Sequence, residues 1–189
     1  GESERVLGII GREAKRMQGL VEDLMSLSRL EAVKHDAPTE PVDIVALARE
    51  AIGEIGDTAS VQLTSDADQA HVGGDRGQLA QVIRNLLDNA IKYGKPDGEI
   101  TIVIEASDTG WLLLSIRDQG EGIAPDHLPR LTERFYRADA SRSRSLGGTG
   151  LGLAIVKHIV ERHRGRFDIS SRQGSGTTAS VMLPLQKNM

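Results

Sequence analysis

Apolar residues recur with a helical period over the first thirty or so residues of the chain. No proline occurs between residues 3 and 33, and the apolar side chains step by three or four positions through Val6, Ile10, Ala14, Met17, Val21, Leu24 and Leu27. Charged residues flank this stripe, as in a bundle or coiled-coil helix. A single stripe cannot bury itself, so the pattern predicts one long amphipathic helix, about 45 Å long, that packs against another helix; dimerisation is its expected use.

The residues that follow predict a linker and then a second domain. Residues 35–41 (HDAPTEP) hold two prolines and no apolar period, which separates the helical segment 1–34 from a domain over 42–189. In that domain, Asp43 is placed to cap a helix over 44–55, and Gly94 to end a helix over 76–93. Strands are expected at 61–65 and 71–74, hairpins over 99–117 and 166–183, and a third helix over 151–163.

Helices mixed with mostly antiparallel strands indicate the α+β class. We therefore expect a two-layer α/β sandwich preceded by the long helix, rather than a doubly wound parallel sheet. Between the strands and the third helix, residues 118–150 form a long loop rich in glycine and arginine. Long loops within compact domains are usually binding segments, so this loop is where function is expected.

The composition of the chain excludes several kinds of catalytic site and binding partner. The chain has 189 residues, a formal net charge of −4 and no cysteine, which excludes thiolate catalysis and thiolate metal sites. The mild acidity argues against a nucleic-acid partner, and no apolar run reaches the ~20 residues of a membrane span. The 21 glycines exceed the usual share, and six of them lie between residues 118 and 152.

One predicted helix carries polar side chains on one face. Asn85, Asn89 and Lys92 are spaced i, i+4 and i+7, while apolar residues on the other side face the core. An amide oxygen suits Mg²⁺ and a lysine suits phosphate. On its own, a pair of asparagines on a helix is more often a solvated surface than a metal site.

Two glycine-rich segments add further candidates. Asp118 ends a strand and is followed by Gly120 and Gly122, so a ligand with an exocyclic amine could approach it closely, although a plain turn has the same pattern. Gly148, Gly150 and Gly152 lead into a helix N-terminus, which attracts phosphate. A dinucleotide fingerprint would need a strand before these glycines, and polar residues stand there instead.

The order of these segments resembles sensor histidine kinases. NLLDNAIKYG (85–94) looks like their N box, DQGEGI (118–123) the first glycine box, ERFYRAD (133–139) the F box and GGTGLGLA (147–154) the second glycine box. The family belongs to the ATPase superfamily of gyrase and heat-shock chaperones, built on the Bergerat ATP-binding fold. The resemblance covers residues 41–185, and LMSLSRLEA (24–32) is similar to the second helix of the family's dimerisation and phosphoacceptor bundle. PRLTERFYRAD together with AIVKHIV looks most like the phosphate-starvation sensor branch.

The resemblance implies ATP and Mg²⁺ as ligands and gives each matching residue a role. Asn89 would hold the metal with support from Asn85, and Lys92 and Arg137 would contact the phosphates. Asn85, Lys92 and Arg137 are then the catalytic residues.

The same carry-over assigns the two ends of a nucleotide pocket. Tyr93 would flank the adenine and Asp118 would accept from its amino group, with Thr178 nearby through water. The remaining matches shape the base pocket or close over the phosphates: Gly120, Gly122, Ile123, Gly148, Gly150, Leu151 and Gly152.

Departures from the family pattern qualify the resemblance. Thr132 and Ala179 replace phenylalanines that the family commonly has, so the phosphate-covering segment is expected to pack more loosely. The phosphoacceptor motif, a His followed by Glu or Asp and four residues on by Pro, does not occur; His35 precedes Asp36, but its proline comes too early. The chain is therefore expected to begin after the acceptor helix of a parent kinase.

The function that the resemblance implies is transfer of the γ-phosphoryl group of Mg-ATP to a histidine outside this chain, for relay to a response regulator. A cytoplasmic location follows, and it is compatible with a parent protein anchored in the inner membrane. A gyrase- or chaperone-type hydrolase would carry a glutamate at position 85, and an amide cannot act as a general base. A nucleotide-sensing or partner-binding module without phosphotransfer shares the same motifs and stays open.

Overall fold

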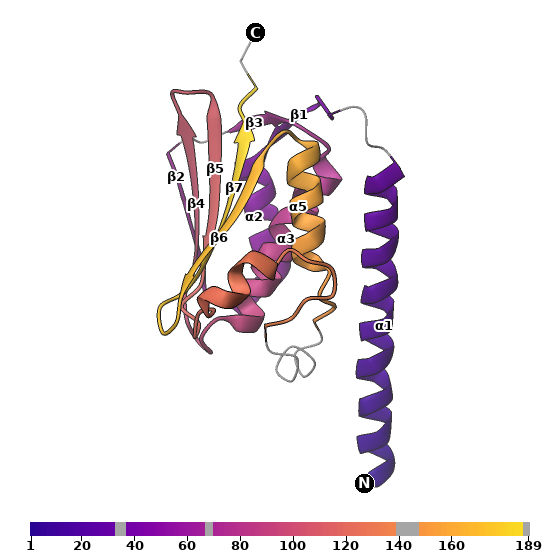
Figure 1. Ribbon diagram of the computed structural model, residues 1–189. Helices are drawn as coiled ribbons and strands as arrows, with labels where there is room; N and C mark the ends of the chain where they lie inside the picture. Colours follow the sequence, from indigo (N-terminus) through magenta and orange to yellow (C-terminus); the bar gives the residue numbers. More distant parts are fainter. Residues whose placement is uncertain (33–36, 67–69, 139–147, 187–189) are drawn as a thin grey trace.

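The computed structural model describes residues 1–32, 37–66, 70–138 and 148–186. Its centre is a five-stranded mixed sheet in the order β2-β4-β5-β7-β6 (Figure 1). Neighbouring strands run antiparallel except β2 and β4, which are parallel. The strands are β2 (Val61–Ser65), β4 (Ile100–Ser107), β5 (Trp111–Arg117), β6 (Arg166–Arg172) and β7 (Gly176–Pro184).

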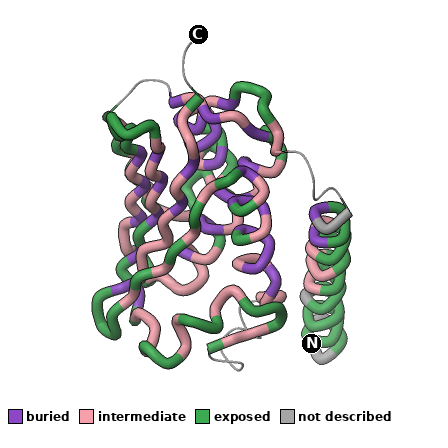
Figure 2. Tube along the Cα trace, turned by 45° about the horizontal axis from the view of Figure 1, so that its top comes forward, coloured by how far each residue is buried: buried purple, intermediate pink, exposed green. Residues whose placement is uncertain are grey.

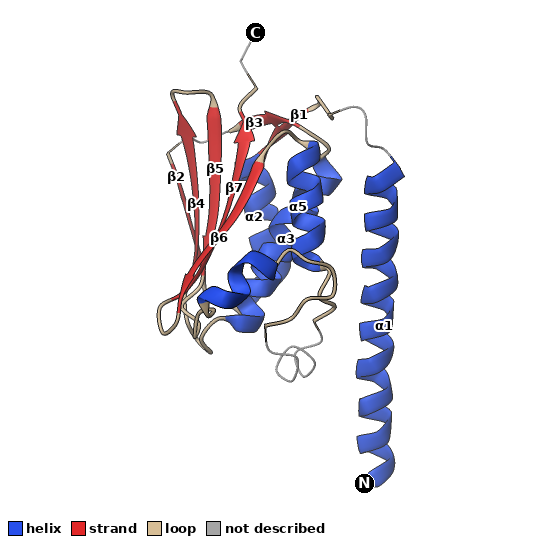
Figure 3. Cartoon of the chain, viewed as in Figure 1, coloured by secondary structure: helices blue, strands red, loops and turns tan. Residues whose placement is uncertain are grey.

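Three helices cover one face of this sheet: α2 (Ile44–Ile55), α3 (Arg76–Tyr93) and α5 (Gly152–Arg162) (Figure 3). Along β4 and β5 every second side chain is buried against them, as the alternation of a half-buried strand requires. The core between the two layers is aliphatic, and its fully buried members include Ile102, Leu114 and Ile155. The expected α+β two-layer sandwich is confirmed.

Local signals in the sequence fix where the helices begin and end. Asp43 caps α2, because its carboxylate accepts from the backbone N–H groups of Val45 at 2.9 Å and Ala46 at 3.2 Å. Asp75 caps α3 in the same way, through Gln78 N–H at 3.0 Å. At the other end of α3 the N–H of Gly94 donates to Ala90, as the glycine signal predicts.

The sequence patterns do not predict a short strand and two short helices that the structure contains. Pro41, placed in the expected linker, begins β1 (Pro41–Asp43), which pairs antiparallel with β3 (His71–Gly73). Three residues are too few to show an alternation, so this strand has no sequence signature. Short 3₁₀ helices η1 (Gly56–Thr58) and η2 (Pro125–Arg130) also form, the second inside the predicted loop 118–150. The first two residues of the expected linker, 35 and 36, lie outside the described residues.

Helix α1 (Glu2–Ala32) lies beside the sandwich and packs on α5 near its own C-terminal end. Leu27 and Leu30 are buried there, and Ser26 donates a 3.0 Å hydrogen bond to Gln81 of α3. Farther toward the N-terminus the apolar stripe is open, with Leu7 67% exposed (Figure 2). None of the described helices combines the length and apolarity needed to cross a bilayer.

Candidate functional site

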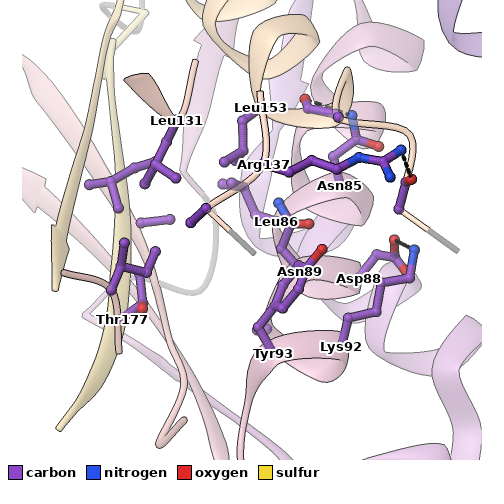
Figure 4. A pocket seen from close by; sticks show the side chains of 18 of the residues that line it. Asn85, Leu86, Asp88, Asn89, Lys92, Tyr93, Leu131, Arg137, Leu153 and Thr177 are labelled. Atoms are coloured by element: carbon purple, nitrogen blue, oxygen red, sulfur yellow. Dashed lines mark hydrogen bonds and ion pairs between the residues drawn. The ribbon is translucent and has the colours of Figure 1, made fainter. Parts of the chain in front are cut away.

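A cavity of about 620 Å³ opens between α3, the ends of β5 and β7, the segment around η2, and α1 (Figure 4). Its apolar lining comes from Ile116, Ile169 and Ala179 of the sheet and from Leu131 and Leu153. Its polar lining comes from α3, from Arg137 and from residues 148–152, which we call the glycine segment. The cavity therefore has an apolar region beside the sheet and a polar region rich in amide and cationic groups.

The polar face of α3 forms one wall, as its spacing predicts. Figure 4 shows Asn85, Asn89, Lys92 and Tyr93 along this one helix. Asn85 donates through Nδ2 to the carbonyl of Gly152 at 3.2 Å, so its orientation is fixed and its amide oxygen is left as an acceptor. Lys92 forms an ion pair of 2.5 Å with Asp88 one turn earlier. The ammonium is thus held at the cavity wall.

Asp118 stands at the end of β5 and is 7% exposed. Its Oδ1 accepts from Gly120 N–H at 2.7 Å and from Thr177 N–H at 3.3 Å. Burial raises the pKa of this carboxyl, and the two backbone hydrogen bonds oppose the shift. Its Oδ2 accepts nothing from the part of the chain that the structure describes, which leaves one carboxylate oxygen at the cavity for a donor on a ligand.

Two glycines are required by the backbone around the cavity. Gly122 has φ +70°, and a Cβ there would overlap the carbonyl of Arg172 at the end of β6. Gly150 has φ +76°, and a Cβ there would press on the backbone of Phe135. Phe135 in turn donates its N–H to Gly150 at 2.8 Å, so the F-box and glycine segments are joined directly.

Arg137 makes a second link between these segments. Its guanidinium donates to the carbonyl of Gly148 and lines the cavity, where Figure 4 shows it reaching across from the segment that follows η2. This position serves a phosphate as readily as the carbonyl it now binds.

Three sequence-predicted residues lie away from the cavity wall. Leu151 is fully buried in the core, and Gly120 packs behind Asp118 against the end of α3. Thr177 rather than Thr178 faces the cavity, together with Ala179. Side chains alternate along β7, so a shift of one residue moves Thr178 to the other face of the sheet.

Sequence reasoning missed a polar pair on the wall near η2. His127 and Tyr136 share a hydrogen bond of 2.6 Å, and Arg130 lies 4.2 Å above the Tyr136 ring. Both His127 and Tyr136 line the cavity. The 3₁₀ helix η2 and the residues that follow it bring the two side chains together, and no spacing rule in the sequence indicates that helix.

A second omission is the contribution of α1. Lys15, Arg16, Gly19, Glu22 and Asp23 all line the cavity, and Asp23 accepts a 2.7 Å hydrogen bond from the hydroxyl of Thr149. The periodicity of α1 indicates an apolar stripe and gives no sign that its polar side reaches the cavity.

Comparison with known proteins identifies the class to which this fold and cavity belong. Residues 74–187 match the family described as histidine kinase-, DNA gyrase B- and HSP90-like ATPase, and the chain belongs to this family. Within it, the similar proteins are sensor histidine kinases.

Three curated relatives show this. The chain is 43% identical over 178 residues to the phosphate regulon sensor protein PhoR of Pseudomonas aeruginosa, covering 92% of this chain and 40% of that protein. It is 36% identical to the sensor-like histidine kinase SenX3 of Mycolicibacterium smegmatis over 91% of this chain and 46% of the relative. It is 37% identical to the sensor protein SrrB of Staphylococcus aureus, over 97% of this chain and 32% of that protein. The chain thus spans less than half the length of these relatives.

Solved structures agree. The mycobacterial sensor histidine kinase MprB matches 78% of this chain and 98% of its own, at 31% identity and a TM-score of 0.68. Full-length ShkA in complex with AMPPNP matches all of this chain and 40% of its own, at 25% identity and a TM-score of 0.82. The latter match includes the long N-terminal helix.

Proposed function

We propose that this chain is the ATP-binding catalytic part of a sensor histidine kinase, which transfers the γ-phosphoryl group of Mg-ATP to a histidine outside the chain. One observation carries the proposal: a single cavity joins a buried carboxylate acceptor at one end to paired asparagines, a lysine and an arginine at the other. A purine nucleotide with a phosphate chain matches this division of apolar and polar walls.

The base would lie at the sheet end of the cavity. Asp118 has a free Oδ2 to accept from an exocyclic amine, which adenine carries and guanine replaces at that position by a carbonyl oxygen. Tyr93 and Ile123 line the same cavity and would bound the ring. Gly122 keeps the backbone close, because any side chain there would collide with the β6–β7 turn.

The phosphates would lie between α3 and the glycine segment. Lys92 is already positioned by Asp88, and Arg137 by the carbonyl of Gly148, so both cations are held where negative charge would arrive. We assign Asn85, Lys92 and Arg137 the catalytic role of orienting the phosphate chain and neutralising its charge.

Mg²⁺ fits the donor set. Asn89 lines the cavity, and Asn85 turns its NH₂ group toward Gly152, so amide oxygens are left as ligands. Among the described residues no three His, Cys, Asp or Glu side chains group as a metal cage. Mg²⁺ commonly takes one or two protein oxygens and completes its shell with phosphates and water. When bound, it would neutralise charge on the β- and γ-phosphates.

The reaction needs no water-activating base at position 85. A neutral imidazole attacks with its ring lone pair, the bond between the γ-phosphorus and the bridging oxygen breaks, and ADP leaves with the electron pair. The hydrolases of the superfamily would need a carboxylate to deprotonate water, and the Asn85 amide cannot do this. Asn85 therefore favours phosphotransfer over hydrolysis.

The test uses a protein that carries the acceptor histidine. It is incubated with Mg²⁺ and γ-labelled ATP, and the protein-bound label should be acid-labile and alkali-stable. Asn89→Ala should abolish the label and the Mg²⁺ dependence of nucleotide binding, whereas Arg84→Ala on the exposed side of α3 should change neither. Tight nucleotide binding without any label would instead favour a nucleotide-sensing module.

The partners follow from the same proposal. The phosphoacceptor helix of the parent kinase and a response regulator would receive the phosphoryl group in turn, in the cytoplasm. Dimerisation would use the open stripe of α1, whose exposed apolar side chains are Val6, Leu7, Ile9, Ile10, Met17, Val21, Leu24 and Met25. Sedimentation of the chain with Ile10→Glu tests this contact, because a charge in the stripe should give monomers.

A further inference from the structure

Helix α1 is tied to the glycine segment by a chain of two hydrogen bonds. The hydroxyl of Thr149 donates to Oδ2 of Asp23 at 2.7 Å. The hydroxyl oxygen of Thr149 in turn accepts from the backbone N–H of Leu151 at 3.2 Å. A hydroxyl has one proton to donate and lone pairs to accept, so both bonds form at once. The hydroxyl of Thr149 thereby links the carboxylate of Asp23 on α1 to Leu151, the residue just before α5.

The contact is partly shielded from water. Asp23 is half-buried, and burial raises the pKa of its carboxyl while the bond from Thr149 opposes the rise. Gly19, one turn earlier on α1, also faces Thr149, with room for a Cβ at 3.9 Å from its methyl group. The bond from Thr149 therefore replaces part of the hydration that the half-buried carboxylate loses.

The contact lies at the phosphate end of the cavity. Thr149 and Asp23 both line it, as do Lys92 and Asn89 across from them. The glycine segment is also held by Arg137, by Phe135 and by Asn85, which donates to the carbonyl of Gly152. Through its bond with Thr149, Asp23 thus anchors the glycine segment to α1.

We infer that Asp23 is a positioning residue of the nucleotide site, which holds the glycine segment in its phosphate-binding arrangement from α1. This inference rests on the proposed function. If the segment is already ordered when nucleotide arrives, binding does not have to supply its ordering entropy. The position of α1 and the affinity for a triphosphate are then coupled, and by linkage a bound triphosphate holds α1 in place.

The test compares two probes, a non-hydrolysable ATP analogue with Mg²⁺ and adenosine, by calorimetry on the full chain. Asp23→Ala should weaken analogue binding about tenfold, the lower end of the effect of losing one charge-assisted hydrogen bond, and leave adenosine binding unchanged. Thr149→Val should do the same, and the double variant should be no weaker than either single one. Thr149→Ser keeps the hydroxyl and should bind as the unsubstituted chain does.

Glu22→Ala is the matched control. Glu22 lines the same cavity and carries the same charge, but its carboxylate accepts from Gln18 of its own helix at 2.9 Å. Glu22→Ala removes one negative charge from the cavity without breaking the bond to Thr149. The affinity of this variant for the analogue should therefore not fall. Three outcomes would overturn the positioning role alone. These are an equal loss of affinity for both probes, losses of affinity that multiply in the double variant, and a loss of analogue affinity in Glu22→Ala equal to that in Asp23→Ala. Failure of the unsubstituted chain to bind either probe would overturn the proposed function and this inference with it.

Discussion

Replacing Asp118 by asparagine should separate folding from ligand recognition. Asparagine has nearly the same shape, and its Oδ1 can keep both backbone hydrogen bonds, from Gly120 and Thr177. Its NH₂ group then takes the place of Oδ2. A donor would face the exocyclic amine of adenine, where the proposed site needs an acceptor.

The two effects have opposite signs. A hydrogen bond to a charged group contributes about 1.5–3 kcal/mol, so ATP affinity should fall roughly 10- to 100-fold. Thermal stability should stay the same or rise, because burial disfavours the charge that the substitution removes. GTP offers a carbonyl oxygen at the amine position, so its affinity should fall less than that of ATP or increase.

The pH dependence of stability gives a third readout. The folded-state pKa of Asp118 lies above its ordinary 3.8, so the folded chain binds more protons than the unfolded chain between these values. The stability that this group contributes is present below pH 3.8 and is lost as pH rises through the folded-state pKa. Asp118→Asn should remove this part of the acid-range profile.

Calorimetry with ATP and GTP, together with thermal unfolding, measures all three effects. Asp126→Asn, an equal change of charge at an exposed position on η2, is the control and should leave both nucleotides unaffected. Unchanged ATP affinity in Asp118→Asn would refute the proposed base contact. A large fall in stability would show that the carboxylate mainly holds the backbone.

Three further predictions concern backbone, pH and charge. In urea unfolding, Gly122→Ala should destabilise the fold by about 2 kcal/mol or more, since its Cβ meets a backbone carbonyl at positive φ. The control Gly110→Ala, at φ +84° with open space around it, should cost about 1 kcal/mol. Burial lowers the pKa of His163 below 6.5, and its Nε2 accepts from a backbone N–H, so the free energy of unfolding should fall as pH drops below 6.5. His163→Gln should flatten this pH dependence of stability, whereas the control His158→Gln should not change it. Lys92→Met should lower ATP affinity about tenfold without changing adenosine affinity, and equal losses for both ligands would contradict a phosphate contact.

Much of the site was readable because it depends on short spacings. Asn85, Asn89 and Lys92 share a wall because a helix repeats every 3.6 residues, and Gly94 ends that helix where predicted. Thr178 shows where such reasoning stops. Which of two neighbouring threonines faces a cavity depends on strand register, and register is set by pairing with β5 and β6.

The sequence by itself therefore determined the fold class, the helix ends and the residue types of the site, since periodicity, caps and ordered motifs are local. Tertiary structure decided which of those residues meet. The bond between Asp23 and Thr149 joins positions 126 residues apart, and the pair formed by His127 and Tyr136 depends on a turn without a sequence signature. Long-range contacts arise from how α1 and η2 pack on the sandwich, and packing depends on shape and burial across the whole molecule rather than on any one segment.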